Sequence, residues 1–558
     1  MSQNVEMSTP SKYPHDLSHF NAFSSPSQFL IPFSPLETLP ADFHHFDPSL
    51  VVEMFPFNSL FFGQITANVD TFFVSLRTIY GDQFYKWFLL RKVKVPTVRL
   101  RDVIPGSTVV HPAITNQYWK LLDMLGYPIN ITSGAGTVNP YPVNPTKFFA
   151  YFKIVRDYYL DPTLDTELIG KIDDALYSIQ LDSIFSSLGF GPSEVPDNLD
   201  QVQMALDANA ETAFHDLWRI NGEFTEANPT SCLIQRRIRR DYFTSLLPNL
   251  QFGEPMRVPV EGPFANDTQG NAQGLIVNTQ RVVIADNSQA SFAASPVYVT
   301  GGSIRDLQRV ESVQKFLERL NFAGGDGAHP KDLLDAIYGE SPENITLGRS
   351  VWIDSFDRQV IMQEVVQNAP SNGADNFLGS KAANGTIAAQ GKPYSIFCKE
   401  HGYVINMFSL MPTVYYAYCP RDSFKHDFAD YYLPDLAMIG EQEVLGQELI
   451  SQVDHTDESE ADGTYYTEEL IGYQPRYQEY RKRPNELHGA FRTAEAAQML
   501  HGRIFNKKVN LNPDFITYPN EAFNQIFAYI NPQADTCYVD VYSEIHSERP
   551  VIDNPTRV

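Results

Sequence analysis

Basic side chains are scarce in this sequence. Its 558 residues include 42 Lys and Arg but 67 Asp and Glu, which gives a formal net charge of −25 at pH 7. Binding to nucleic acid depends on neutralising phosphates with Lys and Arg, so this chain is not expected to carry a uniformly basic face. Contacts with phosphates are expected only where basic residues cluster.

Long hydrophobic runs are also missing. A helix that crosses a bilayer needs about 20 consecutive apolar residues, and the aromatic run Phe55 to Phe62 is short and interrupted by Pro56, Asn58 and Ser59. The first ten residues lack the basic and then apolar segments of a secretory signal. The sequence therefore predicts a chain without membrane-spanning helices that is made in the cytoplasm.

Cysteine is rare and widely spaced, at Cys232, Cys398, Cys419 and Cys537. The chain has no C-x-x-C pair. It also lacks the closely spaced cysteines that form the disulfide framework of small secreted domains. Buried, reduced thiols are expected.

The common catalytic and metal-binding motifs are absent. No H-E-x-x-H, G-x-S-x-G or G-x-x-x-x-G-K-[ST] segment occurs. The segment after Ser133 has Asn139 in place of the third glycine of a dinucleotide loop, so a plain turn is expected. His44 and His45 are adjacent, would point to opposite faces of a strand and are expected at the surface or in a loop. No metal, cofactor or catalytic site is predicted.

Strand patterns dominate what is present. Apolar and polar residues alternate over residues 69–80 and 539–545, the two-residue period of a half-buried strand. Residues 275–285, 297–300 and 403–410 are rich in β-branched or aromatic side chains, which favours further strands.

Helical patterns lie between these strands. Ser303 can cap a helix that carries an apolar stripe to Leu320, and a long helix is predicted within residues 303–325. Helices are also predicted at 115–125 and 147–159. Residues 165–220 have few strand formers and are expected to be mostly helical.

Long loops are expected at 253–273, 366–395 and 452–464, where Gly, Pro, Asn, Asp and Ser dominate. Scattered strands joined by long excursions favour a single β-sandwich with insertions over a βαβ arrangement.

Two basic clusters stand out. The first contains Arg236, Arg237, Arg239 and Arg240, and the second contains Arg481, Lys482 and Arg483, with Tyr477 and Tyr480 beside it. Such clusters can neutralise phosphates, and aromatic neighbours can stack on bases. The same arginines can equally pair with carboxylates across subunit contacts, and the sequence does not decide between these hypotheses.

The segment Arg239–Gly253 resembles the signature of the major capsid protein of the Microviridae, small tailless bacteriophages with circular single-stranded DNA. Residues 20–545 contain further segments that resemble this family in the same order: Phe29–Phe33, Glu37–Pro40, Asp70–Val74, Ile304–Arg319, Glu400–Gly402, Asp430–Ala437, Ile439–Gln442, Ile471–Gln474 and Glu479–Arg481.

The chain also departs from the family pattern. Arg240 stands where the family often has His, and Asn249 or Leu250 where it has Trp. Residues 165–235 match no family segment. These departures indicate a divergent branch and leave the subfamily open.

The resemblance implies one domain over residues 1–558, an eight-stranded antiparallel jelly-roll β-sandwich with long loop and helical insertions. It implies a structural protein rather than an enzyme, assembled with its own copies into a T=1 icosahedral virion shell in the bacterial cytoplasm. Residues 165–235 are the candidate surface protrusion.

Several partners follow from the resemblance. They are packaged single-stranded DNA, a host surface receptor, and spike, pilot or scaffolding proteins. Because the subunit carries a charge of −25, packaging is expected to need a small basic protein or bound cations. A jelly-roll carbohydrate-binding protein or a glycosidase remains the alternative, and the latter would need a carboxylate pair in a cleft.

Overall fold

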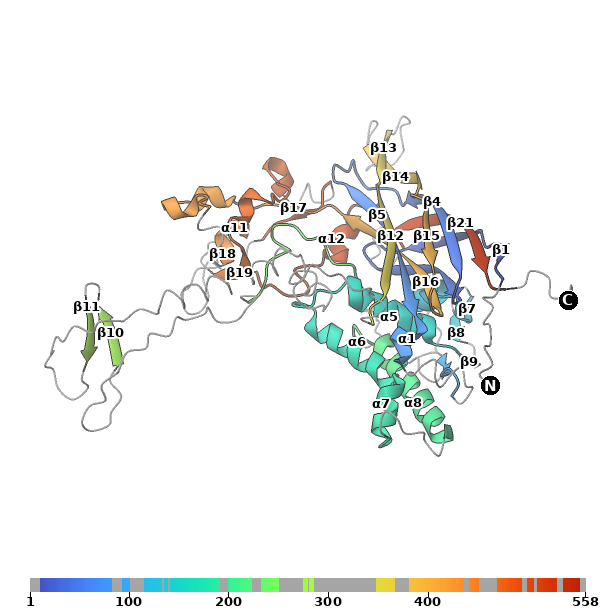
Figure 1. Cartoon of the computed structure of the whole chain (residues 1–558). Coiled ribbons are helices and arrows are strands. Elements are labelled where there is room, and N and C mark those ends of the chain that lie inside the picture. Colours follow the sequence, from blue (N-terminus) through green and yellow to red (C-terminus); the bar gives the residue numbers. More distant parts are fainter. Residues whose placement is uncertain are drawn as a thin grey trace, which may run out of the picture.

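The computed structural model describes sixteen ranges of the chain: 11–82, 93–100, 115–132, 135–138, 141–190, 199–222, 232–249, 274–278, 281–285, 348–366, 381–434, 441–450, 469–493, 499–505, 509–528 and 535–551. These ranges are mostly β, with two large antiparallel sheets (Figure 1). The predicted fold class is therefore confirmed.

The two sheets are built from strands far apart in sequence. The larger, seven-stranded sheet has the order β1 (Tyr13–Asp16), β21 (Cys537–Arg549), β4 (Phe43–Met54), β14 (Lys381–Gln390) and β13 (Ile361–Val366), with β2 (His19–Ser25) beside β21 and β15 (Tyr394–Phe397) beside β4. The smaller sheet has the order β12 (Val351–Gln359), β5 (Ile65–Ser75), β16 (Gly402–Pro412) and β3 (Ile31–Thr38). This arrangement is consistent with the expected jelly roll, whose eight-stranded form remains a prediction.

The main core lies between these sheets. Along β4, Leu50, Val52 and Met54 are buried while Val51 points to solvent, as the period of two requires. Across the gap, Phe23 of β2 stacks on Phe33 of β3 with ring centroids 5.4 Å apart. Burial of such aromatic pairs contributes about 0.5–1.5 kcal/mol beyond the apolar area that is removed from water.

One extended segment, residues 351–366, belongs to both sheets and is called here the edge strip. Its first part is β12, at the edge of the smaller sheet, and its second part is β13, at the edge of the larger sheet. The chain crosses between them at Val360, which is buried and whose N–H donates to the carbonyl of Ile65 at 2.8 Å. The edge strip therefore forms one flank of the sandwich.

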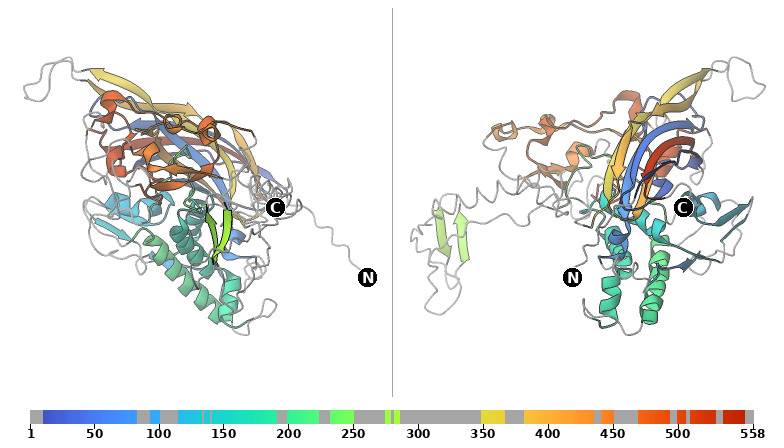
Figure 2. Two further views of the ribbon diagram at one scale, coloured as in Figure 1. Left: turned by 90° about the vertical axis from the view of Figure 1, so that its left-hand side faces the viewer. Right: turned by 45° about the vertical axis from the view of Figure 1, so that its right-hand side comes forward.

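Helices cover the smaller sheet and extend from it. The apolar helix α5 (Thr146–Tyr158) packs on β5 and β16, while α4 (Thr115–Met124) packs on β3. Beyond α5, helices α6 (Thr166–Ser178), α7 (Leu181–Ser187) and α8 (Leu199–Trp218) lie side by side, away from the two large sheets (Figure 2). Leu181, Ile184 and Leu206 belong to a separate small core there. None of the described helices is long and apolar enough to cross a membrane.

The remaining elements are short. They are α1 (Leu76–Tyr80), β6 (Val98–Arg99), β7 (Ile129–Thr132), β8 (Ala135–Val138), β9 (Pro142–Val143), β10 (Gly274–Asn278), β11 (Arg281–Ala285), β17 (Tyr415–Tyr416), β18 (Glu441–Leu445), α11 (Gly446–Leu449), β19 (Leu470–Pro475), β20 (Gly502–Arg503) and α12 (Asn520–Asn524), with 3-10 helices η1 (Arg421–Phe424), η2 (Phe428–Asp430), η3 (Gln478–Tyr480) and η4 (Gly489–Arg492).

Most predicted elements that fall in the described ranges are confirmed. Helices α4 and α5 match 115–125 and 147–159, and β16 and β21 match 403–410 and 539–545. The segment 275–285 is a pair of strands, β10 and β11, rather than one. Helices α6 to α8 supply the helical content expected for 165–220. The predictions for 253–273, 297–300, 303–325 and 452–464 lie outside the described residues.

Two predictions are wrong. Residues 69–80 are not one strand, because β5 ends at Ser75, whose hydroxyl accepts a hydrogen bond from the Thr78 N–H at 3.2 Å and caps α1. Part of the loop predicted at 366–395 is a strand, because residues 381–390 form β14 between β4 and β13, while residues 367–380 lie outside the described residues. Gly385 suggested a loop by composition, but a Cβ there would lie 2.7 Å from Cγ1 of Val360, so packing between the sheets requires glycine.

Candidate functional site

A cavity of about 710 Å³ opens where the end of α5, the first basic cluster and the edge strip meet. Its wall includes Asp70 of β5, Tyr159 after α5 and Trp352 of β12. The described lining residues also include Arg236, Arg237, Arg239, Arg240, Asp157, Asp161, Asp241 and Arg349. The cavity is therefore lined by charges of both signs.

Arg236 is held inside this wall by three groups of the same chain. Its Nη1 lies 2.8 Å from Oδ2 of Asp70 and 2.7 Å from the hydroxyl of Ser409, and its guanidinium lies 5.2 Å from the ring centroid of Tyr159. The Tyr159 hydroxyl donates to the same Asp70 oxygen at 2.7 Å. Burial raises the pKa of Tyr159, so it stays protonated and can donate. Arg236 thus joins β5, β16 and α5.

The other three arginines of the first cluster also meet aspartates of their own chain. Arg237 forms an ion pair with the buried Asp165, and Arg240 contacts Asp161 at 2.9 Å. Arg239 contacts Asp357 of the edge strip at 3.2 Å. Neither sequence hypothesis included this intrachain pairing, because the aspartates lie far away in sequence. The Arg239 side chain is 83% exposed and the Arg240 side chain 46%, so both still reach solvent.

The second cluster follows η3 on the surface. Arg481, Lys482 and Arg483 are exposed. Arg483 donates to Glu486 at 2.8 Å, and hydrogen bonds from His488 and Arg483 lower the pKa of Glu486 to about 2. Ion pairs that are this exposed contribute little to stability, so they leave the cations available to a polyanion.

Exposed tyrosines lie next to the second cluster. Tyr480 is 56% exposed, and the ring of Tyr432 lies 6.0 Å from it. Lys425 contacts the Tyr480 hydroxyl at 3.0 Å and lies 4.4 Å from its ring centroid. Tyr477, by contrast, is buried. We name Tyr431, Tyr432, Tyr480, Arg481, Lys482 and Arg483 the aromatic–basic surface.

The chain that follows the second cluster reaches the cavity lined by the first, although the two clusters are far apart in sequence. Asn485, two residues after Arg483, lines the cavity and donates from Nδ2 to the carbonyl of Val414 at 2.9 Å. Val414 lines the same wall. Only the chain just after the second cluster therefore reaches the cavity that the first cluster lines. Sequence reasoning identified both clusters but had no signal for this arrangement.

The histidine pair differs from its prediction in one respect. His44 and His45 do point to opposite faces of β4, but His44 is fully buried rather than at the surface. Its Nδ1 lies 2.6 Å from the hydroxyl of Ser547, and its Nε2 lies 3.4 Å from Asp42. Desolvation lowers the pKa of His44, although Asp42 opposes this effect.

The four cysteines are free thiols. Cys232, Cys398 and Cys537 are free and buried as predicted, whereas Cys419 is only half-buried. Burial raises the pKa of Cys398 to about 12, which keeps the thiol protonated and unreactive. Within the described ranges, no group of three or more His, Cys, Asp or Glu side chains is placed to hold a metal ion.

The chain is similar to known proteins. The family model described as "Capsid protein (F protein)" matches residues 3–555. The capsid protein VP1 of Bdellovibrio phage phiMH2K is 25% identical over 56% of this chain and 62% of the relative. Those of Chlamydia phage 1 and Spiroplasma virus 4 are 23% and 22% identical, over 47% and 71% of this chain and 54% and 68% of the relatives. The chain thus spans less than two thirds of the first two relatives.

Proposed function

Because this chain belongs to the capsid protein (F protein) family, matched over residues 3–555, we propose that it is the major structural subunit of a small T=1 icosahedral shell around circular single-stranded DNA. The match over nearly the whole chain carries the proposal. A two-sheet sandwich with long excursions supports it, because a shell subunit needs several different contact surfaces around the symmetry axes. Neither the family nor its relatives support the alternative of a carbohydrate-binding protein or a glycosidase.

The shell proposal has a direct test. Expressed chain is examined by negative-stain electron microscopy and sedimentation, alone and with its virion partners. Uniform hollow spheres built from many copies are expected. Isolated monomers or small oligomers under all these conditions contradict the proposal.

We further propose that the aromatic–basic surface, together with Arg239 and Arg240, contacts the packaged DNA. Exposed cations can release counterions from phosphates, and tyrosine rings can stack on bases without demanding a sequence. The exposure of Arg239, of Arg240 and of the second cluster supports this assignment. Arg236 and Arg237 belong to the same cluster, but their pairing with Asp70 and Asp165 gives them a supporting role in the wall.

The DNA contact is tested with two double variants of matched charge loss. One is Lys482→Gln with Arg483→Gln on the aromatic–basic surface, and the other is Lys171→Gln with Arg358→Gln elsewhere on the surface. Both variants are expected to form shells. As the salt concentration is raised, particles of the first variant are expected to retain less DNA than particles of the second. Equal retention by both variants contradicts the assignment.

The remaining partners are proposed on the same basis. A small basic protein or bound cations would neutralise most of the DNA, because the subunit is strongly acidic. The helices of residues 165–235 project from the sandwich and are candidates for the surface that meets a host receptor (Figure 2). Assembly in the bacterial cytoplasm and contacts with spike, pilot or scaffolding proteins belong to the same proposal.

A further inference from the structure

Strand β13 leaves one edge of the larger sheet open. All six of its residues, Ile361–Val366, pair with β14 on one side, and no strand of the described ranges pairs on the other. The β13–β14 pair extends past the neighbouring strands (Figure 2). An open edge offers a row of backbone N–H and C=O groups to a second strand.

The side chains of β13 lack the features that protect open edges. Ile361 is 65% exposed and Val365 is 54% exposed, on the face that also carries Gln363. Glu364 is the single charged residue of β13, and the strand contains no Lys or Pro. Edge strands of stable monomers are usually blunted by charge, proline or bulges, so this strand is suited to being covered.

The sequence of β13 is complementary to itself in the antiparallel direction. When two copies pair about Gln363, Ile361 of each copy lies opposite Val365 of the other, and Met362 lies opposite Glu364. Apolar residues then meet on one face, and no two carboxylates are opposed. A parallel pair in register would place the two Glu364 side chains next to each other, which is unfavourable.

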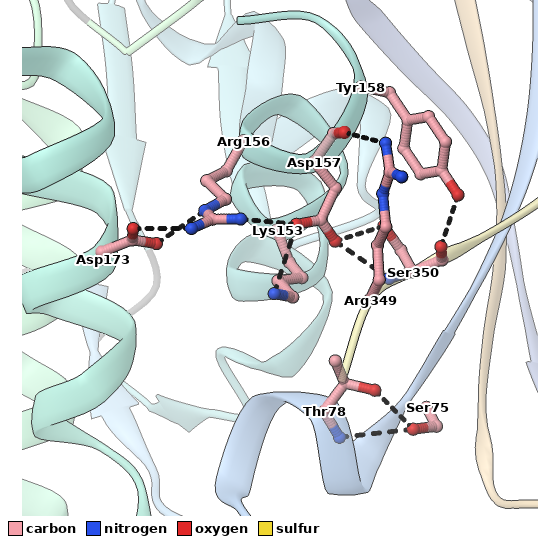
Figure 3. Close-up of polar contacts among 9 residues, drawn as sticks. All are labelled: Ser75, Thr78, Lys153, Arg156, Asp157, Tyr158, Asp173, Arg349 and Ser350. Atoms are coloured by element: carbon pink, nitrogen blue, oxygen red, sulfur yellow. Dashed lines mark hydrogen bonds and ion pairs between the residues drawn. The ribbon is translucent and has the colours of Figure 1, made fainter. Parts of the chain in front are cut away.

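The edge strip is fixed before any partner arrives, by the pairing of β13 with β14 and by contacts just before β12. The buried carboxylate of Asp157 in α5 accepts hydrogen bonds from the N–H and the hydroxyl of Ser350 at 2.9 and 2.7 Å (Figure 3). Arg349 Nη2 donates to the carbonyl of Asp157 at 2.7 Å, and the Tyr158 hydroxyl donates to the carbonyl of Ser350 at 2.5 Å. A fixed strand loses less conformational entropy on binding than a loose one.

From this geometry we propose that β13 pairs antiparallel with β13 of a second copy of the chain across a two-fold axis, centred on Gln363. The contact is isologous, as a two-fold axis requires, and joins the larger sheets of two subunits into one continuous sheet. The inference rests on the proposed shell function, because it names one of the contacts by which copies meet.

The test is disulfide trapping in assembled particles. In Gln363→Cys, the two thiols lie opposite each other, with Cα atoms about 4.5–5.5 Å apart, which a disulfide can bridge. Mild oxidation is expected to give a covalent dimer on non-reducing gels. In the control Gln359→Cys, the two thiols are offset by eight positions, roughly 27 Å, and no dimer is expected.

A second design guards against failure of the first variant to assemble. Ile361→Cys and Val365→Cys chains are assembled separately and as a mixture, and only the mixture is expected to yield the efficient cross-link. The proposal is overturned by intact shells in which the Gln363→Cys chain stays monomeric and its introduced thiol reacts with maleimide. Efficient dimer formation by the Gln359→Cys chain overturns it as well. Failure of the unmodified chain to form shells would instead contradict the proposed shell function.

Discussion

Asp157 and Ser350 lie 193 residues apart in the chain and are joined by two hydrogen bonds to one buried carboxylate. Lys153 and Arg156 of the same helix add ion-pair contacts at 3.3 and 3.4 Å (Figure 3). This cluster fixes the end of α5 to the residue that precedes β12. A side chain of a helix outside both sheets therefore helps to set where the edge strip begins.

Asp157→Ala is expected to destabilise the subunit by about 3 kcal/mol, because it leaves buried donors and nearby cations without their partner. Chemical unfolding of unassembled subunits measures the loss. Asp173→Ala is the matched control, because Asp173 pairs with the same Arg156 but is 44% exposed, and it should cost less than about 1 kcal/mol. Equal losses for the two variants would contradict the assigned role of Asp157.

Arg236→Gln is expected to lower the stability of the subunit, whereas Arg239→Gln is expected to lower DNA retention. Arg236 is enclosed by Asp70, Ser409 and Tyr159, and its loss leaves Asp70 with an uncompensated charge, so a destabilisation of about 2–3 kcal/mol is expected. Arg239 is mostly exposed, so its loss should change stability by less than about 0.5 kcal/mol and lower DNA retention. Thermal unfolding and DNA content are measured on the same preparations, and the reverse pattern would refute the division of roles.

The free energy of unfolding is expected to fall at acid pH because of His501. Its ring is enclosed by Phe61, Tyr518 and Phe523, and burial lowers its pKa to about 3. The unfolded chain binds a proton near pH 6.5 while the folded chain does not, so stability falls as pH drops from 6.5 towards 3, by about 1.4 kcal/mol per unit. His44 acts in the same direction.

Replacing His501 tests this linkage. His501→Phe should flatten the dependence of unfolding free energy on pH between 6.5 and 4, whereas His546→Gln, at an exposed position, should leave it as in the parent chain. Unfolding in urea at a series of pH values provides the comparison. An unchanged slope in His501→Phe would show that other groups control the acid response.

Two glycines should respond oppositely to alanine. At Gly402, in β16, an added Cβ would lie 2.3 Å from the backbone carbonyl oxygen of Val74, which cannot move without breaking the sheet. Gly402→Ala is expected to cost about 1–3 kcal/mol or prevent folding. Gly170, inside α6, has no atom within 4 Å of the added Cβ, and Gly170→Ala should stabilise by about 0.5–1 kcal/mol. The melting temperature is expected to be lower than that of the parent chain for Gly402→Ala and higher for Gly170→Ala.

Local patterns predicted local structure well. The helices α4 and α5 and the strand β21 follow from the periodicity of their apolar residues, and β16 follows from its run of β-branched and aromatic residues. The strand prediction for residues 69–80 failed at Ser75, because the side chain of Ser75 caps helix α1 and so ends the strand. The loop prediction failed at Gly385, where packing against Val360 rather than turn formation selects glycine.

The candidate site was predictable only in part. Both basic clusters are visible in the sequence, but the pairing of Arg237 with Asp165 or Arg239 with Asp357 depends on tertiary contacts between distant segments. A chain with 67 acidic residues offers too many possible partners for sequence reasoning to choose among. Tyr477 shows the same limit, because its position beside the cluster did not reveal that its side chain is buried.

The crossing at Val360 places Trp352 and Asp357, on the cavity side, and the open β13 on one piece of extended backbone. Each of the two strands is held in its own sheet, β12 by β5 and β13 by β14. If the proposed contact at β13 forms, that contact and the aspartate that pairs with Arg239 belong to one uninterrupted stretch of backbone. A substitution that displaces this stretch would then disturb both at once.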